Sequence, residues 1–204
     1  MRRDEPNRRR AAFLDRDGVI NIDRGYVYHR EDFDFVPGML EGSRALCELG
    51  YLLVVVTNQS GIGRELYSEG DFETLTAWMK AEFLTAGAPL SGVYFCPHHP
   101  SEGLGPYQCS CDCRKPAPGM LTAAARDLNI DLSASIMFGD SESDLSAAQA
   151  AGVPLRVLLG TDGRDVPLIP SVPGLASAAF RRLDEALMDP ALRSKLGAPN
   201  TISG

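Results

Sequence analysis

The chain has 204 residues and a mass of 22.0 kDa, which is enough for one domain with a sizeable core. Hydrophobic residues make up 44% of it, and no apolar run approaches the roughly 18 residues that cross a bilayer. The formal net charge of −7 argues against a general nucleic-acid binder, which normally carries a basic stripe. No signal-peptide core follows the basic N-terminus, so we expect a cytoplasmic protein without a membrane or nucleic-acid partner.

Short apolar runs alternate with amphipathic stretches from residue 11 onward. Strands are predicted at residues 11–14, 52–56, 92–95, 136–138 and 153–159. Helices are predicted at residues 39–49, from 68 to at least 83, and at 120–128, 145–151 and 175–188. Strands that alternate with helices form βαβ units, so we expect an α/β fold with a Rossmann-like, doubly wound and mostly parallel sheet.

The two ends differ from this body in composition. Residues 1–10 are rich in arginine and lack apolar periodicity, which predicts a disordered basic tail. Residues 11–190 are predicted to form a single domain, and residues 191–204 a flexible tail. The segment between Asp17 and Thr57 already includes a predicted helix and strand, so it leaves no room for a large cap domain over the site.

Acidic side chains follow the first predicted strand. Asp15 and Asp17 lie two positions apart, so both would point to the same side of an extended segment. In a parallel sheet, ligands bind at the carboxyl ends of the strands. Two carboxylates there suit a Mg²⁺ site with one carboxylate acting as a nucleophile, although a solvated polar strand end is also compatible with this pattern.

Polar groups also follow the later strands. Thr57 and Ser60 come directly after a buried strand. They could bind an anion, or they could belong to an ordinary turn after the strand. Arg114 and Lys115 precede a predicted helix, and near Asp15 they would supply the positive charge that phosphoryl transfer needs.

The fourth strand is followed by two further carboxylates. Asp140 is a candidate Mg²⁺ ligand, and Asp144 lies in the first turn of the next helix. A structural alternative is helix capping by Ser141 or Ser143, with a favourable dipole contact from Asp144.

Cysteine and histidine residues cluster between residues 96 and 113. The two pairs Cys96-x-His98 and Cys111-x-Cys113 supply four ligands of the kind that hold a structural, tetrahedral Zn²⁺. Cys109 lies in the same alternating run, so it could replace one of these ligands or remain free. The zinc loop, residues 96–113, would otherwise be long for a compact domain.

Taken in this order, the motifs resemble the haloacid dehalogenase superfamily of aspartate-nucleophile phosphatases. The likeness is closer to the D-glycero-D-manno-heptose 1,7-bisphosphate phosphatases, and next to the histidinol-phosphate phosphatases. It spans residues 13–144 and rests on the strings FLDRDGVIN, DRGYV, VVVTNQSGIGR, FETLTAWM, YFCPHHP, CDCRKPAPGM and GDSESD.

This resemblance implies a role for each motif. Asp15 would be the nucleophile and Asp17 the general acid and base. Asp15, the Asp17 backbone carbonyl and Asp140 would hold the catalytic Mg²⁺. Thr57 and Lys115 would bind the phosphoryl oxygens. The remaining substrate contacts would come from Asp23, Arg24, Gly25, Tyr26, Asn58, Gln59, Ser60 and Arg114.

The expected activity is removal of the C7 phosphate from heptose 1,7-bisphosphate by a monomeric, capless, Mg²⁺-dependent enzyme that also holds a structural Zn²⁺. Histidinol phosphate is the alternative substrate, because the two families share these motifs. A polynucleotide 3′-phosphatase would use the same catalytic design, but the acidic charge balance argues against it. A zinc-stabilised binding module with an inactive site is the non-enzymatic alternative.

Overall fold

The structure, a computed structural model, describes residues 8–160 and 173–197. Its strands form one parallel sheet with the order β3-β2-β1-β4-β5-β6. The strands are β1 (Ala11–Leu14), β2 (Leu52–Asn58), β3 (Leu90–Cys96), β4 (Ile136–Gly139), β5 (Leu155–Leu159) and β6 (Ala178–Phe180). The order reverses direction at β1, as the predicted doubly wound sheet requires.

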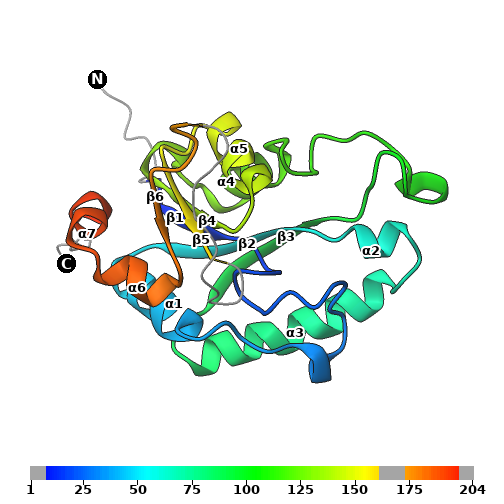
Figure 1. Ribbon diagram of the computed structural model, residues 1–204, viewed down its shortest axis with the longest axis horizontal. Helices are drawn as coiled ribbons and strands as arrows, with labels where there is room; N and C mark the ends of the chain where they lie inside the picture. The colour runs from blue at the N-terminus through cyan, green and yellow to red at the C-terminus, as the bar shows by residue number, and fades with distance from the viewer. Residues whose placement is uncertain (1–7, 161–172, 198–204) are drawn as a thin grey trace.

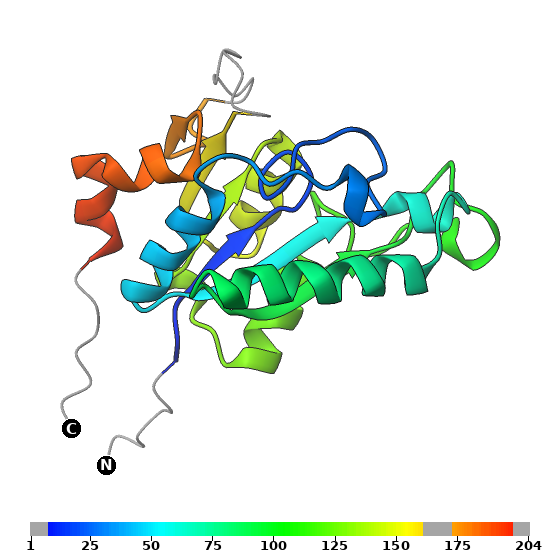
Figure 2. The same ribbon diagram turned by 90° about the horizontal axis from the view of Figure 1, so that it is seen from below.

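Helices cover both faces of the sheet, with α1, α3 and α6 on one side and α4 and α5 on the other (Figure 1). Figure 2 shows α1 and α3 lying across the same face. The α-helices are α1 (Met39–Glu48), α2 (Ser60–Gly63), α3 (Glu69–Thr85), α4 (Gly119–Leu128), α5 (Glu142–Ala150), α6 (Leu183–Met188) and α7 (Pro190–Leu196). Short 3-10 turns occupy Arg30–Asp32, Gly105–Tyr107 and Leu132–Ala134.

The two hydrophobic layers follow from the alternation of side chains along buried strands. In β1, Ala12 and Leu14 pack into the layer that contains α1, α3, α6 and α7. Ala11 and Phe13 pack into the opposite layer with α4 and α5. Because all four are fully buried, β1 is apolar along its whole length, as expected for the central strand of a parallel sheet.

Local sequence signals account well for the first helices. The predicted helix start at Ser68 is confirmed, because the Ser68 side chain accepts from the Asp71 backbone N–H and the Asp71 carboxylate accepts from the Ser68 N–H.

Between Asp17 and Thr57 the structure holds only a 3-10 turn, α1 and most of β2, so no cap domain is inserted there. No helix of the described residues combines the length and apolar character needed to cross a bilayer.

The prediction of one helix over residues 175–188 is wrong. Residues Ala178–Phe180 form strand β6, which pairs with β5 at the edge of the sheet, and only Leu183–Met188 are helical as α6. Strand formation here depends on a partner strand distant in the sequence, and a short apolar run does not by itself distinguish a strand from a helix.

The predicted flexible tail from residue 191 is also wrong over residues 191–196. Helix α7 begins with Pro190, and the Asp189 carboxylate accepts from the Leu192 N–H at 2.8 Å. Leu192 and Leu196 are buried in the core. The predicted tail beyond residue 197 lies outside the described residues.

The predicted disorder of residues 1–10 is wrong at its end. The Arg9 N–H donates to the Asn129 carbonyl at 3.0 Å, and the Arg10 guanidinium donates to the Leu196 carbonyl at 2.6 Å and lies over the Tyr51 ring. These contacts tie both ends of the described chain to the body. The prediction for residues 1–7 concerns residues outside the described part.

We predict that Leu196→Ala lowers the free energy of unfolding by about 2–5 kcal/mol, because it removes buried apolar volume. Urea denaturation measures the change. The control Leu84→Ala, at a residue that is 65% exposed, is expected to change it by less than about 0.5 kcal/mol. Equal stability of wild type and Leu196→Ala would contradict the packing of α7.

Candidate active site

The carboxyl edge of the sheet gathers the predicted catalytic side chains. Asp15 directly follows β1, Thr57 lies at the end of β2, and Asp140 directly follows β4. Lys115 reaches the same place from the loop between β3 and α4, and Asp144 from the first turn of α5. Since parallel strands end at the same edge, residues distant in the sequence meet here.

Lys115 is the central cation of this group. Its side chain is 1% exposed, and its Nζ lies 2.9 Å from Asp15 Oδ1 and 2.5 Å from Asp144 Oδ1. It also donates to the Val56 carbonyl at 2.8 Å. Burial by itself lowers the pKa of this amine, but the charges of Asp144 and Asp15 outweigh burial and raise the pKa above its ordinary value. The lysine therefore stays charged.

Three carboxylates surround this single cation. Asp15, Asp140 and Asp144 each offer an oxygen, and these oxygens all lie within 4.8 Å of one another. Burial and the nearby Asp144 raise the pKa of Asp15 to about 7, and burial and Asp15 raise that of Asp140 to about 8. The excess negative charge and the all-oxygen donor set fit a hard divalent cation such as Mg²⁺.

Asp144 divides its two oxygens between structure and charge pairing. Its Oδ2 accepts from the N–H and Oγ of Ser141, and Ser141 Oγ in turn accepts from the Asp144 N–H. Of the two predicted cap residues, Ser141 and Ser143, Ser141 is the N-cap of α5. Because Oδ1 meets Lys115 instead, Asp144 anchors the lysine to the start of α5.

Asp17 lies in a separate hydrogen-bond network. Its carboxylate accepts from Arg16 Nη2 at 2.9 Å, from Asn21 Nδ2 at 3.1 Å and from Gln59 Nε2 at 2.8 Å. Its side chain is not among the three carboxylates grouped around Lys115. The two aspartates of the motif therefore have different environments, and the predicted metal contact of the Asp17 backbone carbonyl stays a prediction.

Thr57 and Asn58 are neighbours in β2, and each contacts a different network. Thr57 is buried, and its Oγ1 accepts from Gln59 Nε2 at 2.8 Å. Both groups of the Asn58 amide bond to the Lys115 backbone, Oδ1 accepting from its N–H at 3.0 Å and Nδ2 donating to its carbonyl at 3.1 Å. Asn58 thus holds the lysine loop, in addition to the substrate contact predicted for it.

A cavity of about 350 Å³ opens beside Asp17. The predicted substrate residues that line it are Asp23, Gly25, Tyr26, Asn58, Gln59 and Ser60, with Gly61 and Tyr67 completing the wall. Among the described residues, Arg24 and Arg114 are not part of this wall. Arg24 pairs with Asp34 at 2.6 Å in an exposed position, and Arg114 Nη1 donates to the His98 carbonyl at 3.1 Å.

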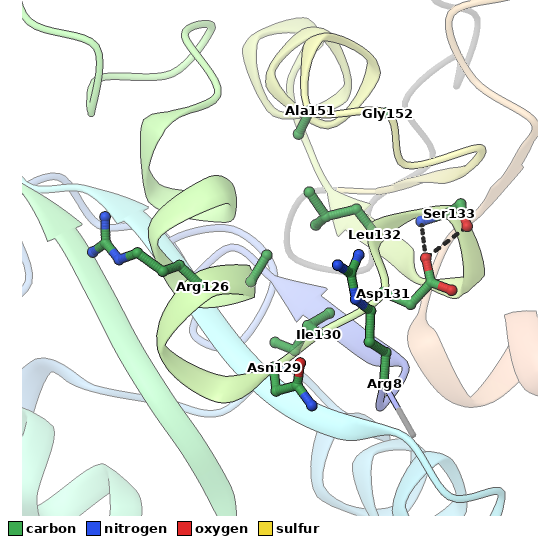
Figure 3. A pocket seen from close by; sticks show the side chains of 10 residues that line it. Arg8, Arg126, Asn129, Ile130, Asp131, Leu132, Ser133, Ala151 and Gly152 are labelled. Atoms are coloured by element: carbon green, nitrogen blue, oxygen red, sulfur yellow. Dashed lines mark hydrogen bonds between the residues drawn. The ribbon is translucent and has the colours of Figure 1, made fainter. Parts of the chain in front are cut away.

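A larger cavity, of about 670 Å³, lies at the edge of the sheet where the strands begin (Figure 3). Figure 3 shows Arg8, Arg126 and Asp131 around it, next to the turn that precedes β4. None of the predicted site residues lines it. Size therefore does not identify the site in this protein, whereas the convergence of charged groups at the strand ends does.

Sequence reasoning missed Arg16, Asn21 and Tyr67. Arg16 is only 2% exposed. From the sequence, an arginine between two aspartates is expected to be exposed to solvent. Tyr67 donates to Gln59 Oε1 at 2.5 Å. Asn21 is the last residue of the FLDRDGVIN motif, but nothing in that motif indicates its hydrogen bond to Asp17.

The predicted zinc ligands come together in the loop after β3. Cys113 Sγ lies 3.1 Å from Cys96 Sγ, 3.2 Å from Cys111 Sγ and 3.3 Å from His98 Nδ1. These four donors form a compact group of three sulfurs and one nitrogen, a set that suits Zn²⁺. Cys109 is outside this group.

The chain is similar to several known proteins. A family model described as HAD-hydrolase-like matches residues 112–167. The D-glycero-beta-D-manno-heptose-1,7-bisphosphate 7-phosphatase of Vibrio cholerae serotype O1 is 52% identical over 151 residues, which is 74% of this chain and 81% of that protein. The D-glycero-alpha-D-manno-heptose-1,7-bisphosphate 7-phosphatase of Burkholderia mallei is 55% identical over 150 residues, covering 74% of this chain and 79% of that protein.

A solved structure shows the same fold. The D,D-heptose 1,7-bisphosphate phosphatase from B. bronchiseptica, complexed with magnesium and phosphate, matches with a TM-score of 0.73 and 30% identity. The match covers 86% of this chain and 94% of that chain.

The raised carboxyl pKa values predict an unusual pH dependence. From about pH 4 up to about pH 7 for Asp15, and up to about pH 8 for Asp140, the folded, metal-free protein holds a proton that the unfolded chain has lost. Its free energy of unfolding should therefore fall as the pH rises, by up to about 1.4 kcal/mol per pH unit for each such proton. Urea denaturation at pH 5 and pH 8 with a chelator present measures this.

Asp140→Asn removes one of these titrating groups, so the free energy of unfolding of this variant should fall less steeply as the pH rises. The control Asp127→Asn, at a carboxyl that is 44% exposed, should leave it unchanged. A stability that rises from pH 5 to pH 8 in the wild type and in Asp140→Asn alike would contradict this account.

Proposed function

The chain belongs to the haloacid dehalogenase-like phosphatases, in the family of the heptose 1,7-bisphosphate 7-phosphatases, and we propose that it removes the C7 phosphate of D-glycero-D-manno-heptose 1,7-bisphosphate. The observation that carries the proposal is that Asp15, Lys115 and Asp140 lie together at one edge of the sheet. The chain is also 52% identical, over 151 residues, to an enzyme of that name. One of these relatives is named for the beta anomer of the substrate and the other for the alpha anomer. The proposal therefore specifies the C7 phosphate and leaves the anomer open.

In the first step, a carboxylate oxygen of Asp15 attacks phosphorus and forms an aspartyl-phosphate. The bond between phosphorus and the sugar oxygen breaks, and its electron pair stays on that oxygen. Asp17 donates the proton that the oxygen takes up, and so acts as general acid. The separate hydrogen-bond network of Asp17 supports this division of roles, because it keeps the second carboxylate apart from the nucleophile.

In the second step, water hydrolyses the aspartyl-phosphate. Asp17, now ionised, takes one proton from the water, and the resulting hydroxide bonds to phosphorus as the bond to Asp15 breaks. Inorganic phosphate leaves, and both carboxyls return to their starting states. Lys115 and Thr57 bind the phosphoryl oxygens during both steps, since Lys115 contacts Asp15 and Thr57 lies on β2, the strand next to β1.

Asp15 and Asp140, with the backbone carbonyl of Asp17, would hold Mg²⁺. When bound, the ion offsets the repulsion between a negative phosphate and a negative nucleophile. The excess of carboxylates over cations around Lys115 supports this assignment.

The ligands Cys96, His98, Cys111 and Cys113 would hold Zn²⁺ in a structural role. Four protein ligands leave no position open for water, so the ion would stabilise the loop that carries Lys115 rather than take part in the reaction. We propose a monomer that works in the cytoplasm, where reduced thiols are available to bind the metal.

We predict that Asp15→Asn lowers kcat for heptose 1,7-bisphosphate by at least about 10⁴-fold, because the amide cannot attack phosphorus. Release of inorganic phosphate in the presence of Mg²⁺ is the measurement, and omission of Mg²⁺ should suppress it in the wild type. Zinc content should be unchanged in this variant. Full activity of Asp15→Asn would exclude the assigned nucleophile.

The substrate assignment is checked by kcat/KM for heptose 1,7-bisphosphate, histidinol phosphate and fructose 1,6-bisphosphate measured side by side. We expect the heptose ester to lead. A preference for histidinol phosphate would overturn the proposed substrate while leaving the phosphatase chemistry intact.

The zinc assignment predicts different behaviour for neighbouring cysteines. Cys113→Ser should lose bound zinc and lower the thermal midpoint, because it removes a ligand from the group of four. Cys109→Ser, outside that group, should retain both. Elemental analysis of the purified variants decides, and zinc loss in Cys109→Ser would mean that Cys109 is a ligand.

A further inference from the structure

Gln59 connects the proposed general acid to the phosphate side of the site. Its Nε2 donates to Asp17 Oδ2 and to Thr57 Oγ1, each at 2.8 Å. Its Oε1 accepts from the hydroxyl of Tyr67 at 2.5 Å. Gln59 is 2% exposed, so this amide has little access to water and depends on these three partners.

The direction of the Gln59 amide matters, because Asp17 is ionised in one half of the reaction. With Nε2 toward Asp17, the amide donates to a carboxylate, which is a charge-assisted bond. A flipped amide would place Oε1 against the same carboxylate oxygen, and two acceptors would then face each other. Tyr67 favours the first arrangement, since its hydroxyl donates to Oε1.

Tyr67 is itself held in place by the fold. It lies between α2 and α3, directly before Ser68, the N-cap of α3. Its ring stacks on Tyr28, with centroids 5.0 Å apart and planes 12° from parallel. Burial raises the pKa of the Tyr67 hydroxyl to about 12, so the group keeps its proton at neutral pH.

Asp17 accepts further hydrogen bonds from Arg16 and Asn21. Arg16 Nη2 donates to the Asp17 carboxylate and to the Val27 carbonyl, and Asn21 donates to Asp17 Oδ1. Arg16 contacts both oxygens of this carboxylate, but no hydrogen bond of the described residues joins Arg16 or Asn21 to Thr57. The link between the general acid and the phosphate-binding hydroxyl therefore passes through Gln59.

We propose that Tyr67 is a positioning residue: by fixing the Gln59 amide, it holds the Asp17 carboxyl in the direction needed to protonate the leaving sugar oxygen. This inference rests on the proposed function, because it takes Asp17 as the general acid. The proton moves from Asp17 to the oxygen released from phosphorus, and Tyr67 neither gains nor loses a proton.

The test uses two phosphate esters that differ in their need for an acid. The alkoxide leaving from the sugar must be protonated, whereas 2,4-dinitrophenolate leaves without a proton. Tyr67→Phe removes one hydroxyl and keeps the stacked ring. The first turnover is followed by rapid mixing of the Mg²⁺-loaded protein with heptose 1,7-bisphosphate or with 2,4-dinitrophenyl phosphate.

We expect Tyr67→Phe to slow the first turnover of the sugar ester about tenfold, a part of the 10²–10⁴-fold that general acid catalysis contributes. KM for that ester should stay within about twofold, and dinitrophenolate release should also change by less than about twofold. Gln59→Leu should show the same pattern with a larger loss. The control Tyr94→Phe removes a surface hydroxyl that bonds to Asp127 and should change neither rate.

Equal slowing with both esters would overturn the proposal, because it would mean that Tyr67 supports the nucleophile or the fold. An unchanged rate with the sugar ester, or a rise in KM alone, would also overturn it. Failure of the proposed substrate is a separate result: if the wild type cleaves histidinol phosphate and not the heptose ester, the same comparison is made with histidinol phosphate, whose leaving alkoxide has the same need for a proton.

Discussion

The buried ion pairs of Lys115 with Asp15 and Asp144 are the contacts on which the rest of the site depends. They join three separate parts of the chain: the end of β1, the loop after β3 and the start of α5. A buried charge that loses its partner typically costs about 3–5 kcal/mol, so these groups are tolerated in the interior only together. The bond from Lys115 to the Val56 carbonyl and the two bonds from Asn58 to its backbone fix the cation further.

The surplus of negative charge that remains around Lys115 has a functional consequence. One ammonium cannot compensate three carboxylates, so Asp15 and Asp140 hold their protons to higher pH than usual. A divalent cation and a phosphoryl group would complete the charge balance. The divalent cation would pair with the carboxylates, and the phosphoryl group would pair with the divalent cation and with Lys115. The stability of the metal-free site and its capacity for phosphoryl transfer are therefore two results of the same arrangement.

Two carboxylates that are neighbours in the motif have different surroundings. Asp15 meets Lys115, whereas Asp17 accepts from Arg16 and from Gln59. This separation allows one to act as nucleophile and the other to carry a proton. The cavity beside Asp17 is lined by Asp23, Gly25 and Tyr26 and by residues 58–61, and no cap domain is inserted between Asp17 and Thr57.

The sequence by itself determined the alternation of strands and helices, the residues at the strand ends, the Ser68 cap and the cluster of cysteine and histidine residues in the zinc loop. These features depend on local periodicity and on residue types at short spacing. Only the tertiary structure decided that 178–180 is a strand, that α7 packs into the core, that Asn58 holds the Lys115 backbone and that Tyr67 reaches Asp17 through Gln59. Each of these depends on a partner brought close by the folded sheet, and a pattern read along one segment carries no information about that partner.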